Sequence, residues 1–323
     1  MRAVVYRGRG GNDVVHLEER DDPEPGEDDV RIRVRFAGMN PADVAQRNGH
    51  YPAPPGSPPD IPGLEVAGTV DAVGSRVSRW KVGDRVLGLV GGGGLADRVV
   101  AHERLLAPIP DGLDERLAAA VPEAYVTAHD AICIQGGLRL GHTLLVHGAA
   151  GGVGTASVQI GLASGCRVYG VVRSDRTADH VQGLGATPIR DRHFADELLE
   201  ATAGHGADVI IELVGAPHFP ANLEAVAEAG CIVIVGTGAG TKADIPFRHL
   251  MAKRAMVRGT MLRGRPLELK ALAVRLFEQQ VLPQLADRRF VPCIDSTYPV
   301  ERVTHALDRM EESGKLGKVL LEL

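Results

Sequence analysis

The chain has 323 residues, 44% hydrophobic and 24% charged, which is typical of folded globular proteins and long enough for two domains. Its 36 Lys and Arg and 41 Asp and Glu residues give a formal net charge of -5, so it lacks the basic field that attracts nucleic acid or anionic membrane. The four cysteines form no CxxC pair or metal-ligand cluster, so we expect reduced thiols and no metal site. No apolar run approaches about 18 residues, and we expect a cytoplasmic protein.

The first third of the chain predicts short β-strands separated by turns. Residues 31–36 alternate between charged and apolar side chains, as a half-exposed strand does. Residues 50–62 contain six prolines, which favour a stiff, extended segment. Four successive glycines at 91–94 mark a loop. We therefore expect a partly open β domain over residues 1–122.

From residue 123 onward, apolar strands alternate with helical stretches, which is the pattern of βαβ units in a doubly wound parallel sheet. This α/β domain is expected to span residues 123–262. A helical stretch at 267–280 and a closing strand at 318–323 are expected to rejoin the β domain, which would then comprise 1–122 and 263–323. The strands expected in the parallel sheet are residues 143–146, 168–172, 209–214 and 231–235.

A glycine-rich turn follows the first of these strands and precedes a stretch with helical spacing of apolar residues. It reads A-x-G-x-x-G, with Ala149 in the place of the commoner first glycine. Gly151 would let backbone N–H groups approach a dinucleotide pyrophosphate, and Gly154 would permit close packing of helix on strand. The residues expected to hold the pyrophosphate are Ala150, Gly151, Gly152, Val153 and Gly154.

The end of the next strand indicates which dinucleotide binds. An NAD site usually has Asp or Glu there, but this chain continues from Val172 with Arg173, Ser174, Asp175 and Arg176. Two guanidinium groups and a hydroxyl suit the 2′-phosphate of NADPH. Asp175 argues for NAD, yet it lies beyond the strand end and can equally cap the following helix.

Motifs spread over nearly the whole chain carry a family resemblance. The sequence resembles the zinc-independent quinone oxidoreductases of the medium-chain dehydrogenase/reductase superfamily, most of all the branch containing the tumour-suppressor-inducible NADPH quinone oxidoreductase. The motifs that carry this resemblance are residues 40–43 (NPAD), 46–51 (QRNGHY), 62–68 (PGLEVAG), 82–86 (VGDRV), 122–128 (PEAYVTA), 149–154, 298–300 (YPV) and 317–319 (GKV).

The resemblance implies a GroES-like catalytic domain, a Rossmann domain, NADPH in the cleft between them, and a homodimer formed through the edge of the Rossmann sheet. Zinc-dependent relatives place a Cys just before the position of Asn40, where this chain has Gly38 and Met39, so a zinc alcohol dehydrogenase is not expected. The resemblance places Asn40 and Tyr51 at the catalytic site. It assigns to the cofactor Val126, Thr127, Ser174, Arg176, Gly236, Thr237 and Leu262. Arg173 and Lys318 are further predicted cofactor contacts. Arg192, where relatives often have Tyr, would reinforce the phosphate site or face solvent.

The expected reaction is transfer of the NADPH hydride to a quinone or another conjugated carbonyl. The amide of Asn40 or the hydroxyl of Tyr51 would stabilise the resulting oxyanion, while Asp43 and Arg47 are expected to form a helical ion pair. An enoyl or enal reductase of a biosynthetic pathway is an alternative, because enones share the polarised conjugated system of quinones. A non-enzymatic NADPH-binding protein, crystallin-like or RNA-binding, is an alternative from another class.

Overall fold

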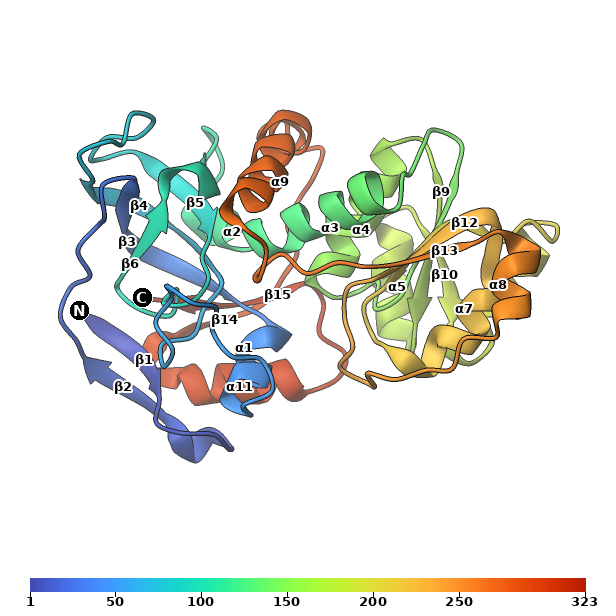
Figure 1. Cartoon of the computed structure of the whole chain (residues 1–323), viewed down its shortest axis with the longest axis horizontal. Helices are drawn as coiled ribbons and strands as arrows, with labels where there is room; N and C mark the ends of the chain where they lie inside the picture. Colours follow the sequence, from blue (N-terminus) through green and yellow to red (C-terminus); the bar gives the residue numbers. More distant parts are fainter. The chain divides into compact units, whose positions relative to one another are not determined.

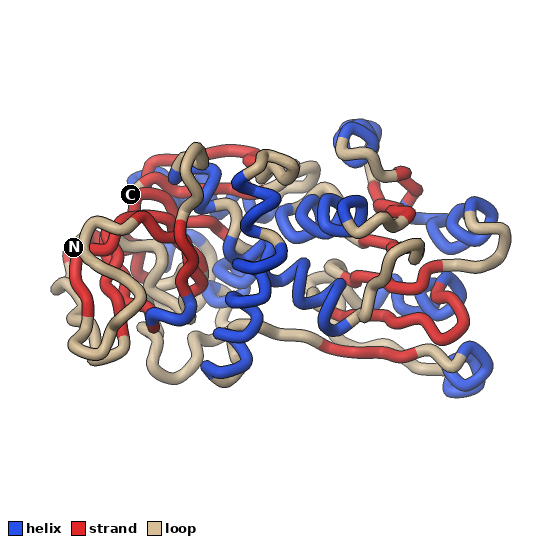
Figure 2. Tube along the Cα trace, turned by 90° about the horizontal axis from the view of Figure 1, so that it is seen from above, coloured by secondary structure: helices blue, strands red, loops and turns tan.

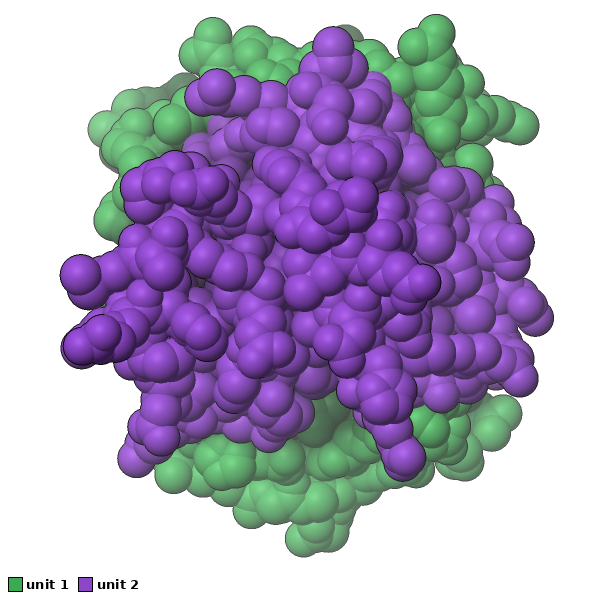
Figure 3. All heavy atoms as spheres, turned by 90° about the vertical axis from the view of Figure 1, so that its right-hand side faces the viewer, with its two compact units in different colours: residues 1–126, 262–323 green, residues 127–261 purple.

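The computed structural model describes all 323 residues and divides them into two compact units. Unit 1 comprises Met1–Val126 and Leu262–Leu323, and unit 2 comprises Thr127–Met261 (Figure 3). The first boundary lies four residues after the expected one at 122, and the second lies one residue before the expected one at 262. Unit 2 is thus a continuous segment inserted into the sequence of unit 1.

Unit 1 is built on a mainly antiparallel sheet in the order β14-β15-β3-β4-β5-β7, with β6 also pairing with β3 (Figure 1). The terminal strands β14 and β7 do not pair with each other, so the expected partly open β domain is confirmed. A separate hairpin-like pair joins β1 and β2. The strands are β1 (Arg2–Tyr6), β2 (Val15–Glu19), β3 (Asp29–Met39), β4 (Glu65–Val73), β5 (Arg85–Leu89), β6 (Arg98–His102), β7 (Leu106–Pro108), β14 (Ile294–Pro299) and β15 (Lys318–Glu322).

The alternation in β3 sets the inner face of this sheet. Val30, Ile32 and Val34 are buried, while Arg33 and Arg35, which alternate with them, are exposed. Period-two alternation places these apolar side chains on one face, where they join a single core cluster with residues of β4, β5 and β15. The strand expected at 31–36 is therefore confirmed as the centre of a longer one.

Short helices complete unit 1, and the helix expected at 267–280 is α9, with the same bounds. The closing strand expected at 318–323 is β15, one residue shorter. No helix of either unit is both long and apolar enough to cross a membrane. The helices of unit 1 are α1 (Pro41–Arg47), α2 (Glu115–Ala119), the π-helical turn η3 (Pro122–Val126), α9 (Leu267–Gln280), α10 (Leu282–Ala286) and α11 (Val303–Glu311), with 3-10 turns η1 (Asn12–Val14), η2 (Glu103–Leu105) and η7 (Val300–Arg302).

Unit 2 contains six parallel strands in the order β10-β9-β8-β11-β12-β13, which is the Rossmann arrangement expected from the sequence. The order reverses between β8 and β11, where such sheets bind their ligands. The sequence pattern predicts the four inner strands but not the two edge strands, which are four residues long and bury few side chains. The strands are β8 (Thr143–Val146), β9 (Arg167–Val172), β10 (Thr187–Arg190), β11 (Ala207–Glu212), β12 (Val226–Ile234) and β13 (Met256–Gly259).

Helices cover both faces of this sheet (Figure 2). Buried strand residues such as Leu145, Ile210 and Ile232 pack with helix residues such as Leu198 and Leu223 in one apolar cluster. The helices are α3 (Thr127–His129), the π-helical η4 (Asp130–Gln135), α4 (Gly152–Ala163), α5 (Asp175–Gly183), α6 (Phe194–Ala201), α7 (Phe219–Ala225) and α8 (Phe247–Lys253), with 3-10 turns η5 (Asp191–His193) and η6 (Ala216–His218).

The start of α4 depends on a close approach that only glycine permits. A Cβ atom at Gly154 would lie 2.7 Å from the Cα of Ala149. We expect Gly154→Ala to lower the free energy of unfolding of unit 2 by about 1–3 kcal/mol, because overpacking forces the loop and helix apart. Gly183→Ala in α5 is the matched control, since a Cβ there meets nothing within 4 Å and should stabilise by about 0.5–1 kcal/mol. Equal effects of the two changes in urea titrations would contradict this interpretation.

Candidate functional site

The predicted pyrophosphate loop lies between β8 and α4 in unit 2. Gly151 is the N-cap residue of α4, and no side chain caps the helix there. The first-turn N–H groups of Gly152, Val153 and Gly154 therefore point out of an uncapped helix end that carries partial positive charge. Ala150 is buried just before this turn. Together these positions form a site suited to an anion such as a pyrophosphate.

A buried polar network supports the loop from the ends of β8 and β11. His147 Nε2 lies 2.7 Å from Asn222 Oδ1, and the Asn222 amide donates to Glu212 Oε2 at 2.8 Å. The other Glu212 oxygen accepts from the backbone N–H groups of Val214 and Gly215. Burial opposes ionisation of Glu212, but its contacts with His218 and His147 and the two backbone N–H groups lower its pKa to about 2. The charged carboxylate thus fixes the turn after β11, and Asn222 connects it to His147 at the end of β8.

Three arginines with no ion-pair partner gather around the ends of β9 and β10. Val172 and Arg190 are register partners at the carboxyl ends of these neighbouring parallel strands. Arg173 follows one strand and Arg192 follows the other after a further residue, and both side chains are exposed, as is that of Arg176 in the first turn of α5. The register therefore brings residues predicted for the 2′-phosphate to one edge of the sheet.

Ser174 and Asp175 have defined roles at the same edge. Ser174 is the N-cap of α5 and forms a capping box with Thr177. Asp175 pairs with Arg190 at 2.5 Å. The acidic residue that argued for NAD is therefore engaged with a different arginine and leaves Arg173 and Arg176 uncompensated.

The remaining cofactor candidates of unit 2 lie at helix and strand ends. Gly236 and the exposed Thr237 follow β12, and a Cβ at Gly236 would lie 2.8 Å from the carbonyl carbon of Leu213. Thr127 begins α3 and is 7% exposed, and its buried hydroxyl has no hydrogen-bond partner. A buried hydroxyl without a partner is costly unless a ligand supplies one, so Thr127 is a candidate ligand contact.

In unit 1, Asn40 sits in a buried network with Lys318 and Glu65. The Lys318 ammonium donates to Asn40 Oδ1 at 2.5 Å and to the Met39 carbonyl at 2.8 Å, and it lies 2.5 Å from Glu65 Oε1. The Asn40 amide donates to Glu65 Oε1 at 2.9 Å and to the Gly38 carbonyl at 3.3 Å. All three Lys318 hydrogens and both Asn40 amide hydrogens are thus used within unit 1. These bonds leave neither residue an unused N–H in this structure, and the assignments of Asn40 to catalysis and of Lys318 to the cofactor stay predictions.

The expected ion pair between Asp43 and Arg47 is wrong. Asp43 instead caps its own helix, accepting from the Asn40 N–H at 2.8 Å and the Gly63 N–H at 3.0 Å. Arg47 points elsewhere and pairs with Glu311 at 2.9 Å. Burial raises the pKa of Asp43 to about 6 despite these bonds. The N-cap geometry competes with i,i+4 pairing and wins because it satisfies helix N–H groups that would otherwise be buried.

Tyr51 opens the proline-rich segment and is held by an arginine distant in sequence. The Arg263 guanidinium donates to the Tyr51 carbonyl at 3.2 Å, to the Gly91 carbonyl at 2.8 Å and to Gln46 Oε1 at 2.6 Å. Its central carbon also lies 5.1 Å from the centre of the Tyr51 ring. Arg263 therefore fastens the proline-rich segment to the glycine run, and no sequence motif pointed to it. The side chain of Tyr51 is only partly buried, which leaves its ring accessible.

Two further residues complete the unit 1 site. Val126 is buried at the end of η3 and Leu262 lies beside Arg263 in the wall of a small pocket. Glu123 also lies in this wall, and the sequence motif that contains it predicts no role for it. Its backbone N–H donates to Glu65 Oε2 at 2.8 Å, which connects η3 to the network around Lys318. The signal that could have found it is a carboxylate inside an otherwise apolar helical stretch.

We expect Lys318→Met to lower the free energy of unfolding by about 3–5 kcal/mol, because it leaves the fully buried Glu65 without a cation. The double variant Glu65→Gln/Lys318→Met should recover part of this loss, since no buried charge remains unpaired. Lys81→Met, at an exposed lysine, is the control and should change stability little. Urea titrations of the four proteins measure these differences, and a double variant no more stable than Lys318→Met would contradict the interpretation.

Comparison with family models finds matches in both units. The model described as alcohol dehydrogenase GroES-like domain matches residues 26–111, and the model described as zinc-binding dehydrogenase matches residues 152–279. A quinone oxidoreductase of Lama guanicoe is 33% identical, over 100% of this chain and 98% of its own length. A quinone oxidoreductase of Pseudomonas aeruginosa is 35% identical, over 85% of this chain and 87% of its own length.

Solved structures agree with the fold over its full length. A mycobacterial protein complexed with NADPH is 26% identical and superposes with a TM-score of 0.90, covering 100% of both chains. An NAD-dependent alcohol dehydrogenase is 30% identical with a TM-score of 0.87, again covering 100% of both chains. These neighbours and the Rossmann order of unit 2 together support a nicotinamide cofactor.

Proposed function

We propose, since this chain belongs to the quinone oxidoreductase family of medium-chain dehydrogenases/reductases, that it transfers a hydride from NADPH to a quinone or a related conjugated carbonyl. The substrate class rests on the full-length relatives that carry the name quinone oxidoreductase. The choice of NADPH rests on one observation, the three unpaired arginines at the ends of β9 and β10. NADPH, when bound, supplies the hydride, and the protein supplies placement and electrostatics.

The residues present fit such a cofactor. The uncapped start of α4 suits the pyrophosphate, and the partnerless hydroxyl of Thr127 can accept a ligand contact. Arg173, Arg176 and Arg192 can form charge-assisted bonds with a 2′-phosphate. Family positions on the nicotinamide side complete the proposed site, namely Val126, Thr127, Gly236, Thr237 and Leu262.

At the reacting end, Tyr51 is our choice for the hydrogen-bond donor to the substrate oxygen. Reduction of a conjugated carbonyl places negative charge on that oxygen, and a donor aimed at it lowers the barrier. Asn40 has already given both amide hydrogens to Gly38 and Glu65, so it acts by holding its surroundings. Arg263 restrains the backbone and ring of Tyr51 and thereby orients the hydroxyl.

The experiment that tests this function is NADPH oxidation by metal-stripped protein with one ortho-quinone, one para-quinone, one enal and one enoyl thioester. We expect the quinones to give the highest rates. Dominant rates with the enal or thioester would move the assignment to carbon–carbon double-bond reduction. Tight NADPH binding without turnover of any substrate would instead favour a non-enzymatic NADPH-binding protein.

The proposed phosphate-binding arginines predict cofactor preference. We expect Arg173→Ala/Arg176→Ala to weaken NADPH binding by about 1.5–3 kcal/mol for each charge-assisted hydrogen bond removed, with NADH binding little changed. Arg139→Ala is the control, because that exposed arginine precedes β8 and lies outside the carboxyl-end edge of the sheet. Calorimetric titration of both cofactors measures the change, and unaltered NADPH affinity in the double variant would refute the assignment.

We also propose a cytoplasmic homodimer in which two copies meet at β13. This edge strand offers unpaired backbone groups, and apolar side chains are exposed on it and nearby: Phe247 at 72%, Met251 at 74%, Met256 at 46% and Met261 at 57%. Such an edge with apolar cover favours pairing with a second copy across a two-fold axis. Sedimentation should give a dimer for the parent chain and a monomer for Phe247→Asp, and a monomeric parent chain would overturn this.

A further inference from the structure

The side chain of Glu123 differs from every other acidic group in the unit 1 network. Glu65 is paired with Lys318, and Asp43 accepts two backbone N–H groups. The carboxylate of Glu123 receives no hydrogen bond and forms no ion pair, although its own backbone is fixed by Glu65. It is partly buried, so neither water nor protein fully compensates a charge there.

The charged groups around Glu123 come from every element packed against it. Glu65 of β4 and Asp43 of α1 repel its negative charge, whereas Lys318 of β15 and Arg263 attract it. Both cations, however, make their hydrogen bonds to other groups. Burial, and next the charge of Glu65, raise the pKa of Glu123 to about 7. A carboxyl group of this kind carries its proton at neutral pH in a substantial fraction of molecules.

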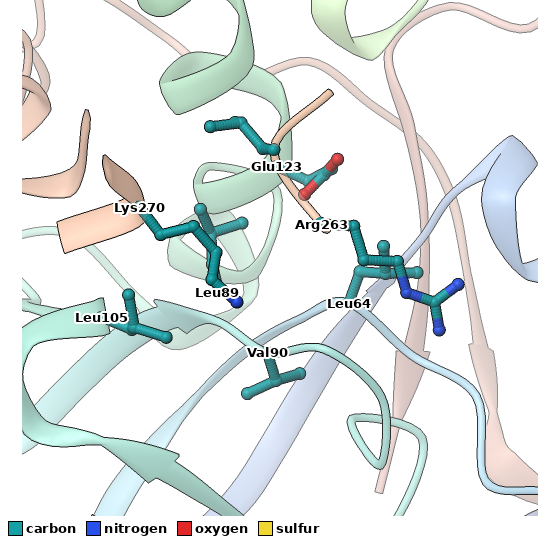
Figure 4. A pocket seen from close by; sticks show the side chains of 8 residues that line it. Leu64, Leu89, Val90, Leu105, Glu123, Arg263 and Lys270 are labelled. Atoms are coloured by element: carbon teal, nitrogen blue, oxygen red, sulfur yellow. The ribbon is translucent and has the colours of Figure 1, made fainter. Parts of the chain in front are cut away.

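The surroundings of Glu123 are otherwise apolar. Figure 4 shows it with Arg263 and Lys270 in a pocket lined otherwise by Leu64, Leu89, Val90 and Leu105. Leu262 also lines this pocket. The enclosed volume of about 10 Å³ holds no more than about one water, so the pocket is not itself a substrate site. Burial in this apolar wall also lowers the pKa of Lys270. The apolar wall thus favours the neutral form of the glutamic acid.

Two observations connect Glu123 with the proposed reaction. Glu123 lines the same pocket as Leu262, a predicted cofactor contact, and Arg263, whose guanidinium donates to the Tyr51 carbonyl and lies over the Tyr51 ring. Glu123 also contributes, after burial, to the raised pKa of Tyr51, so the two side chains share one electrostatic environment. π-helical turns such as η3 occur often at functional sites.

We propose that Glu123 is the general acid that protonates the reduced substrate, a role that rests on the proposed hydride transfer. The hydride adds to the conjugated system with its two electrons and leaves an oxyanion. The Glu123 O–H bond then breaks as a substrate O–H bond forms, which gives the hydroquinone or enol and a Glu123 carboxylate. Solvent returns the proton through the partly exposed side chain, so each turnover consumes one proton in total.

The chemical test compares wild type, Glu123→Gln and Glu123→Asp, with Glu200→Gln as control because Glu200 is exposed and has no ion pair. In wild type, kcat should fall above pH 7, because a general acid must be protonated. Glu123→Gln should lose this dependence and about 100-fold or more in kcat with quinones whose hydroquinone anions are strongly basic. The loss should shrink with electron-poor quinones, whose anions need no proton. Equal losses with both kinds of quinone, or unchanged kcat and pH profile, overturn the proposal.

A second readout needs neither cofactor nor turnover. Carbon-13 NMR of the free protein with labelled glutamate, assigned by the resonance missing in Glu123→Gln, should show Glu123 titrating between pH 6 and 8. Titration near the ordinary glutamate value of about 4.3 overturns the proposal even if the variants fold poorly. Absence of NADPH oxidation by wild type with every quinone and enone tested would instead refute the proposed function, whatever the NMR result.

Discussion

The buried ion pair of Lys318 with Glu65 is the interaction on which the architecture of unit 1 depends. Lys318 is the first residue of β15 and Glu65 the first of β4, and the same ammonium binds the last residue of β3, Met39. One cation therefore joins three strands and, through Asn40, the start of α1. Its burial is tolerated because every hydrogen finds an acceptor, which is the condition for a buried ion pair to persist. Together with the pairing of β15 with β3, this bond holds the C-terminal segment in the β domain, although unit 2 separates the two in sequence.

In unit 2, the register of the parallel strands brings the residues of the proposed cofactor site together. All six strands end at one edge, so loops from distant parts of the sequence meet there. Val172 and Arg190 are register partners at the ends of neighbouring strands. The register alone therefore brings Arg173 and Arg192 to the same edge of the sheet. Glu212, at the end of β11, accepts hydrogen bonds from Val214, Gly215 and Asn222, and Asn222 in turn contacts His147, the residue after β8. The strand order thus determines where the proposed anion-binding edge lies, and a few exposed arginines give it positive charge.

The elements predicted correctly are those whose signal lies in a short, continuous stretch of sequence. The parallel strands of the interior, α9 and β15 were predicted because their apolar patterns are continuous. The edge strands β10 and β13 escaped because they bury little and carry Pro188, Arg190 and Arg258. Arg263 and Glu123 escaped for a different reason: their roles arise from partners brought near by folding, and no spacing in the chain records this. The Asp43 prediction failed because helix capping competes with ion pairing over the same few residues.

The three carboxyl groups near Lys318 explain why only one of them suits proton transfer. Two cations, Lys318 and Arg263, face three acidic side chains, so one acid is left without full compensation. Glu65 takes the ammonium and the Asn40 amide, and Asp43 takes two backbone N–H groups that hold α1 in place. Protonating either would release bonds that the fold needs. Glu123 alone accepts no such bond, so it can gain and lose a proton while the surrounding structure stays as it is.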